Sequence, residues 1–135
     1  RRMTAKARQL GMSHTQFTNA SGLPDAGMST TARDMALLGL ALRRDFPNHY
    51  AYFSLRSFNY KGKQIRGHNK VLDQVAGADG IKTGYIRASG YNLAASVQRS
   101  GRSLVAVVMG GDSGSARDAH MAQLLTATFN RSNRR

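Results

Sequence analysis

The fold class is decided by residues 91–109, which read YNLAASVQRSGRSLVAVVM. Apolar residues alternate with small or polar ones in its first half, at Tyr91, Leu93, Ala95 and Val97. This period of two predicts a strand with one buried face. Residues 99–102 predict a turn, and the unbroken apolar run at 104–109 predicts a central strand that is covered on both faces. Strands joined by so short a turn pair antiparallel.

Two helices are predicted on the N-terminal side of these strands. Residues 3–10 are strong helix formers, and they are followed by Gly11, a common helix breaker. Residues 13–28 are rich in turn-forming residues and predict a long structured loop. A second helix is expected to be capped by one of residues 29–31 and to run to about Arg44. Its apolar residues repeat every three to four positions and predict a core face, made by Met35, Leu37, Leu38, Ala41 and Leu42.

A hairpin, a further strand and a last helix complete the predicted elements. Residues 53–66 predict a hairpin. A polar link at 68–70 and an Asp- and Gly-rich segment at 73–80 then lead to a short strand at 81–86. A polar residue at 112–115 is expected to cap the last helix. The apolar stripe of that helix is Met121, Leu124, Leu125, Thr128 and Phe129. The fold class is therefore α+β, an antiparallel sheet with helices packed on it, in a single domain at residues 1–135.

The charge of the chain is strongly positive. Twenty Lys and Arg residues face seven Asp and no Glu, which gives a formal net charge of +13. This balance suits either a protein that binds polyanions or a basic envelope protein beside an anionic polymer. The cations are dispersed, with short pairs at residues 1–2, 43–44 and 134–135, and no aromatic stacking pattern accompanies them. We therefore expect no specific nucleic-acid partner.

Several classes of protein are excluded by what the sequence lacks. The chain has no cysteine, which excludes a disulfide scaffold and a thiol nucleophile. No apolar run approaches the roughly 20 residues that span a bilayer, so membrane association is expected only through segments outside this chain. The four histidines lie at no metal-ligand spacing, and no Gly-x-Ser-x-Gly elbow supports a catalytic triad. Neither a metal site nor a triad is predicted.

Lys82-Thr83-Gly84 is the segment most suited to chemistry. The Lys82 ammonium can bind a carboxylate as a point charge, and the Thr83 hydroxyl can add a directed hydrogen bond. Gly84 has no side chain, so a substrate backbone can approach the strand closely. The tripeptide alone also fits an ordinary strand that ends in a solvated lysine and a glycine. Its meaning depends on the sequence around it.

The sequence on both sides of this tripeptide carries a family resemblance. Residues 79–85 read DGIKTGY and residues 89–96 read SGYNLAAS. They resemble the third active-site motif and next strand of the serine-type D-alanyl-D-alanine carboxypeptidases, the low-molecular-mass penicillin-binding proteins of peptidase family S11. Further blocks resemble that family in the right order: LGM at 10–12, TQFTN at 15–19, GL at 22–23, STTARDMA at 29–36, NKVL at 69–72 and VVMG at 107–110. The resemblance covers almost the whole chain and implies a penicillin-binding-protein/β-lactamase-like transpeptidase domain.

The resemblance implies roles for the tripeptide and its neighbour. Lys82 and Thr83 would bind the terminal carboxylate of a peptidoglycan stem peptide that ends in D-Ala-D-Ala, with Gly84 in the same site. The backbone N–H of Tyr85 would supply half of an oxyanion hole, and the peptide would add to the strand edge. The intact enzyme would remove the terminal D-Ala through an acyl-serine and would bind β-lactam antibiotics. It would need no metal or organic cofactor and would work in the periplasm or at the outer face of the bacterial cytoplasmic membrane.

Two motifs of the resembled family are absent from this chain. No serine is followed three residues later by a lysine, so no catalytic side chain is assigned here. The Ser57-Phe58-Asn59 segment falls inside the predicted hairpin and is interpreted as a coincidental Ser-x-Asn. Ile86 stands where many relatives carry a threonine, which weakens the polar contacts of the pocket. We expect the chain to be the C-terminal part of a catalytic domain, inactive by itself, whose nucleophile lies upstream.

Other interpretations stay open. A class A β-lactamase or a transpeptidase of the same superfamily would share the strand motif, and deacylation kinetics of the intact protein would separate them. A non-catalytic basic module that binds wall polymer or nucleic acid fits the charge and the missing nucleophile. A Ser-x-x-Lys upstream of Arg1 would favour the enzyme, and its absence would favour the binding module.

Overall fold

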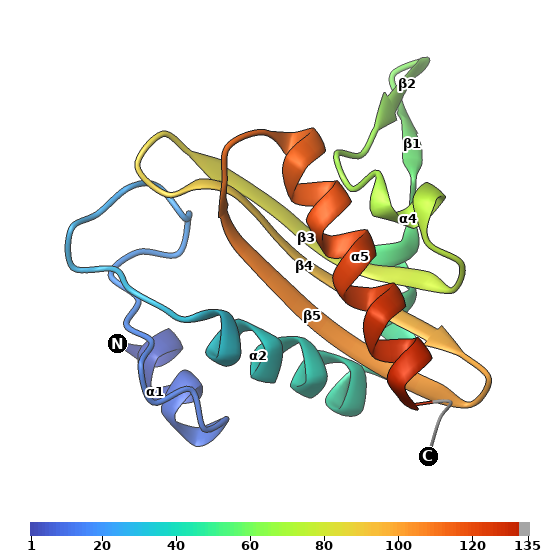
Figure 1. Ribbon diagram of the computed structural model, residues 1–135. Helices are drawn as coiled ribbons and strands as arrows, with labels where there is room; N and C mark the ends of the chain where they lie inside the picture. The colour runs from blue at the N-terminus through green and yellow to red at the C-terminus, as the bar shows by residue number, and fades with distance from the viewer. Residues whose placement is uncertain (133–135) are drawn as a thin grey trace.

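The computed structural model describes residues 1–132 as an antiparallel sheet between helices, with a hairpin beside it (Figure 1). The helices are α1 (Arg2–Gln9), α2 (Ala32–Asp45), α3 (Pro47–Tyr50), α4 (Val71–Gln74) and α5 (Gly114–Ser132), with a 3₁₀ turn η1 (Ala51–Ser54) after α3. The strands β3 (Ala78–Ile86), β4 (Gly90–Arg99) and β5 (Arg102–Gly111) form the sheet in that order, and β1 (Ser57–Tyr60) pairs with β2 (Lys63–Arg66) in the hairpin. The predicted α+β class is confirmed.

The two faces of the sheet are covered by different helices. α5 lies across one face, and the core there comprises Val71, Val75, Leu93, Ala95, Val97, Val108, Met121, Leu125 and Phe129. The predicted stripe of the last helix is therefore confirmed at three of its positions, whereas Leu124 is 39% exposed. α2 covers the other face through Gly39, where an added Cβ would lie 2.9 Å from a methyl group of Val105. A side chain at Gly39 would push α2 away from β5.

Within residues 1–132, β5 pairs with β4 on one side and has no strand partner on the other, so the predicted central position of residues 104–109 is not seen among these strands. The centre of the sheet is β4, which pairs with β3 on one side and with β5 on the other. The apolar run exists because α5 and α2 pack against the two faces of β5. An apolar strand sequence reports the coverage of the faces, and it carries no information on the hydrogen-bonding neighbours at the edges.

Residues 46–80 contain short helical segments that the sequence does not predict. Phe53 lies in η1, and the hairpin begins only at Ser57. Residues 71–74 form α4, which buries Val71 and Leu72 between the two segments expected to be connections. Single helical turns are too short to show a hydrophobic period, so the local pattern does not reveal them.

The N-terminal loop is anchored to α2 through Asp34. Thr31 is the N-cap of α2, and its side chain accepts a hydrogen bond from the Asp34 N–H. The buried Asp34 carboxylate accepts hydrogen bonds from the Thr15 hydroxyl at 2.7 Å and from the His14 N–H at 2.9 Å. These hydrogen bonds hold the pKa of Asp34 below its usual value, and the bond from Thr15 has the largest effect. The loop is thereby fixed against the start of the helix.

Candidate functional site

Lys82-Thr83-Gly84 lies in the second half of β3, at an edge of the sheet. β3 pairs with β4 on one side, where Lys82 stands opposite Ala94 and Gly84 opposite Asn92. Its other edge has no strand partner among residues 1–132. Backbone N–H and C=O groups on that edge are available to an added strand.

The ammonium group of Lys82 carries an unneutralised charge. The side chain is exposed, and Nζ donates a hydrogen bond to the backbone carbonyl of Thr83 at 2.6 Å. In the part of the chain that the structure describes, the ion pairs of the aspartates are made with arginines, and no carboxylate pairs with Lys82. A cation whose one partner is a neutral carbonyl is free to bind an anion.

A groove of about 1230 Å³ opens beside the tripeptide. Residues 82–86 of β3 form one wall, and α5 and the loop at Ser21 and Gly22 contribute others. No atom lies within 4 Å of the position that a Cβ would take at Gly84. Packing within residues 1–132 therefore does not require a glycine at this position, and the groove is open beside it.

A second groove, of about 860 Å³, continues from the first toward the β1–β2 hairpin. We call it the hairpin-side groove. The two grooves share Gly67, His68, Lys70, Gln74, Lys82 and Thr83. The hairpin-side groove is also lined by Ile81 of β3 and by Ser57, Gln64, Ile65 and Arg66 of the hairpin. Lys82 and Thr83 therefore stand at the junction of the two grooves, an arrangement that the sequence does not predict.

A network of polar side chains fixes the start of β3. Arg43 of α2 donates hydrogen bonds to both carboxylate oxygens of Asp79, at 2.7 and 2.8 Å. The Ser96 hydroxyl donates to Asp79 at 2.6 Å and accepts from the Tyr50 hydroxyl at 2.8 Å. Sequence reasoning misses this network, and its one signal is the Asp79-Gly80 pair just before the tripeptide. The network holds the strand in place three residues before Lys82.

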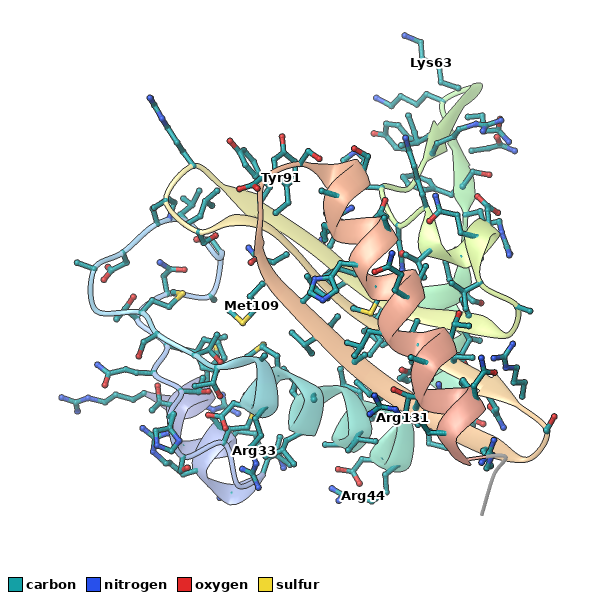
Figure 2. All side chains as sticks on the ribbon, in the orientation of Figure 1. Arg33, Arg44, Lys63, Tyr91, Met109 and Arg131 are labelled. Carbon is teal, nitrogen blue, oxygen red and sulfur yellow. The ribbon has the colours of Figure 1, made fainter. Side chains whose placement is uncertain are left out.

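The two residues after the tripeptide have different surroundings. The Tyr85 side chain is 56% exposed and packs on Tyr91, which lies directly opposite on β4 with a ring-centroid distance of 4.3 Å. Tyr91 stands where the sheet meets the start of α5 (Figure 2). Ile86 is half-buried and lines the first groove. The side chain of Tyr85 is thus used for packing, and its predicted role rests on the backbone N–H.

The other candidates from the sequence lie on the hairpin, in the connection after it and on α5. The Ser57 hydroxyl accepts a hydrogen bond from Gln64 across the hairpin at 3.2 Å, and Asn59 is exposed on the same strand. His68 lines both grooves, and His120 is exposed on α5. Within residues 1–132, no group of three or more His, Cys, Asp or Glu residues lies close enough to hold a metal ion.

The basic residues are spread over the surface. Figure 2 shows Arg33 and Arg44 on α2, Lys63 at the tip of the hairpin and Arg131 at the end of α5. The predicted pair at 134–135 lies outside the described residues. None of the helices in the described part of the chain is long and apolar enough to cross a membrane.

Comparison with known proteins relates the chain to one enzyme family. The family model described as D-alanyl-D-alanine carboxypeptidase, peptidase S11, matches residues 1–113. The D-alanyl-D-alanine carboxypeptidase DacA of Escherichia coli K12 is 38% identical over 128 residues, which cover 94% of this chain and 32% of that protein. The chain therefore spans about a third of the length of this curated relative.

Solved structures share the fold. Penicillin binding protein 5 from Haemophilus influenzae has a TM-score of 0.90 and 34% identity, over 96% of this chain and 38% of its own. Penicillin-binding protein D2 from Listeria monocytogenes, in an ampicillin-bound form, has a TM-score of 0.86 and 30% identity, over 95% of this chain and 54% of its own. Both similarities extend over nearly all of the chain, and therefore over the sheet that carries the tripeptide.

Proposed function

Because this chain belongs to the peptidase S11 family of D-alanyl-D-alanine carboxypeptidases, we propose that the protein that carries it removes the terminal D-alanine of peptidoglycan stem peptides. Residues 1–135 supply the substrate-binding wall of the active site. The nucleophile comes from residues outside this segment. Two observations support this: no serine here has a lysine three residues later, and the DacA relative is about three times as long as the matched segment.

The observation that carries the proposal is an unneutralised cation beside an unpaired strand edge. A peptide in the first groove adds to β3 as an antiparallel strand. The Lys82 ammonium and the Thr83 hydroxyl bind its C-terminal carboxylate and offset the loss of water around that charge. Gly84 lets the peptide backbone approach. The scissile carbonyl oxygen then lies at the backbone N–H of Tyr85, which stabilises the oxyanion together with a second donor.

The reaction is an acyl transfer in two steps. The serine oxygen forms a bond to the carbonyl carbon of the penultimate D-Ala, the C–N bond to the terminal D-Ala breaks, and the serine proton passes through a base to the leaving nitrogen. Water then attacks the ester carbon, which releases the shortened peptide and restores the serine. The residues of this chain bind and orient the peptide, so that both attacks occur at one fixed carbonyl.

The proposal extends to β-lactam antibiotics and to the compartment. A β-lactam presents a carboxylate and a reactive amide, the two features that the Lys82 site and the oxyanion donor recognise in the peptide. The similar Listeria protein was solved with ampicillin, which supports this extension. Peptidoglycan lies outside the cytoplasmic membrane, so we place the protein in the periplasm or at the outer face of that membrane, where a net charge of +13 suits anionic surroundings.

Release of D-alanine from an acyl-D-Ala-D-Ala peptide by the intact protein tests the proposal. We expect turnover, and we expect a fluorescent penicillin to label the protein covalently and to block that turnover. Rapid hydrolysis of the β-lactam without peptide turnover would identify a β-lactamase of the same superfamily instead. A folded intact protein that neither turns over the peptide nor becomes labelled would overturn the proposal.

A further inference from the structure

We infer that the hairpin-side groove binds the leaving-group side of the substrate and favours a leaving amino acid with an anionic side chain. The inference rests on the proposed function and assigns a second part to the same site. The side chain of a terminal D-alanine is only a methyl group. Within residues 1–132, the groove that begins at Lys82 and Thr83 measures about 860 Å³, so this part of the site leaves space beside the bound carboxylate.

The direction of the peptide on β3 decides which of its ends faces this groove. With the carboxylate at Lys82 and the scissile carbonyl at the Tyr85 N–H, the acyl part of the peptide continues past Ile86. The hairpin-side groove is lined by Ile81, Lys82 and Thr83, at the opposite end of the site. Atoms on the leaving side of the scissile bond therefore point into it. Because Lys82 and Thr83 already hold the carboxylate, the part that extends into the hairpin-side groove is the side chain of the leaving residue.

The hairpin presents an unpartnered cation to this groove. Arg66 pairs across the hairpin with Ser57, and both residues line the groove. No hydrogen bond or ion pair involves the Arg66 side chain within residues 1–132. Gln64 lies two residues before Arg66 on β2, on the same face of the hairpin, and it lines the groove as well. A side chain that ends in a carboxylate can place its charge at Arg66.

The remaining charged groups leave the groove positive. Asp73 lines it, but this carboxylate forms an ion pair with Arg56, which also donates to the Leu72 carbonyl at 2.6 Å. Lys70 lines both grooves and has no side-chain partner among the described residues. An anionic leaving group is therefore attracted, whereas a cationic one is repelled. The covalent step is unchanged: the same C–N bond breaks, and its nitrogen takes the proton.

The test compares three peptides that differ in their leaving residue, acyl-D-Ala-D-Ala, acyl-D-Ala-D-Glu and acyl-D-Ala-D-Lys, as substrates of the intact protein. We expect the wild type to prefer D-Glu over D-Lys in kcat/KM. Arg66→Gln should lower the D-Glu to D-Lys ratio about tenfold, the size of one charge-assisted contact. Lys63→Gln is the matched control, because Lys63 belongs to the same hairpin but lines neither groove. Thermal melting verifies that both variants fold.

Each outcome bears on the inference. A ratio that is the same in wild type and Arg66→Gln, or that falls equally in Lys63→Gln, would overturn it. Turnover of the D-Ala peptide with no preference for D-Glu would also overturn it, while the proposed function would stand. If the wild type cleaves none of the three peptides, the proposed function fails and this inference fails with it.

Discussion

Arg43 and Asp79 form a bidentate ion pair, in which Nη2 of Arg43 donates to both carboxylate oxygens at 2.7 and 2.8 Å. The arginine comes from the last turn of α2, and the aspartate lies in β3 three residues before Lys82. Both side chains are largely withdrawn from solvent, with 19% and 28% exposed. The guanidinium also lies over the Tyr50 ring, 4.4 Å from its centroid. The pair thus ties a helix that covers the sheet to the strand that carries the candidate site.

Replacing Arg43 by methionine is expected to lower the free energy of unfolding by about 1–3 kcal/mol, because Asp79 then keeps a partly buried charge without its partner. Arg44→Met is the matched control. Arg44 pairs with Asp45 at the surface, where its side chain is 69% exposed, and such pairs contribute about 0–1 kcal/mol. Urea titration of both variants measures the difference. Equal losses in the two variants would contradict this account of the ion pair.

The periodic elements of the fold could be predicted because their burial repeats along the chain. Met121, Leu125 and Phe129 face the core from one side of α5, as their spacing indicates. The turn between β4 and β5 follows from Ser100 and Gly101, which take φ values of 52° and 71°. The order of the strands within residues 1–132 could not be predicted, because strand order depends on backbone pairing and leaves no trace in an apolar run.

The candidate site could be proposed from the sequence because one segment holds the residues with suitable chemistry. Lys82-Thr83-Gly84 is contiguous, and it lies at the edge strand beside a groove. The network behind it joins residues that are 36 positions apart for Arg43 and Asp79, and 46 positions apart for Tyr50 and Ser96. Such partners meet only once the helices have packed on the sheet, so no local pattern encodes them.

Asp34 is expected to make the stability of the chain sensitive to acid. Hydrogen bonds hold its pKa below the usual 3.8. A carboxyl group whose pKa is lower in the folded than in the unfolded chain stabilises the fold fully above the unfolded value, and this contribution is lost as pH falls through the folded pKa. The free energy of unfolding should therefore fall below pH 3.8 more steeply in wild type than in Asp34→Asn.

Urea titrations between about pH 6 and pH 2 provide the measurement for Asp34. Thr15→Val removes the hydrogen bond that lowers the pKa most, so its pH dependence should lie between those of wild type and Asp34→Asn. Parallel curves for wild type and Asp34→Asn would show that the carboxylate has no such role.

The Gly84→Val substitution is expected to weaken peptide binding without destabilising the fold. No atom lies within 4 Å of the new Cβ, so the free energy of unfolding should change by no more than about 0.5 kcal/mol. The valine methyl groups would occupy the strand edge that a peptide must approach, and kcat/KM of the intact protein should fall at least about tenfold. Gly80→Ala is the contrasting variant, because its Cβ would lie 2.8 Å from the Ser96 hydroxyl and should destabilise the fold. Near-normal turnover by Gly84→Val would show that Gly84 is not needed for the peptide to approach the strand edge.

Residues 1–135 by themselves should neither hydrolyse D-Ala-D-Ala nor form a stable adduct with a labelled penicillin. No serine among them has a lysine three residues later, so no serine is activated in the manner of the family. Mass spectrometry of the penicillin-treated segment is the measurement, with the intact protein as the positive control. Labelling of the segment at stoichiometric yield would instead place a nucleophile among its own serines.

Replacing Lys82 is expected to be the most damaging single change to activity within this chain. The substrate ends in a carboxylate, which must lose water to enter the site, and a fixed cation at the strand edge offsets that loss. Lys82→Ala in the intact protein should cost about 2–4 kcal/mol of transition-state stabilisation, and Lys82→Arg should retain part of the activity because the charge survives. Lys63→Ala is the control, since Lys63 lies at the hairpin tip and lines neither groove. The measurement is kcat/KM on a D-Ala-D-Ala peptide, with folding verified by thermal melting. A folded Lys82→Ala enzyme with near-normal turnover would show that the carboxylate is bound elsewhere.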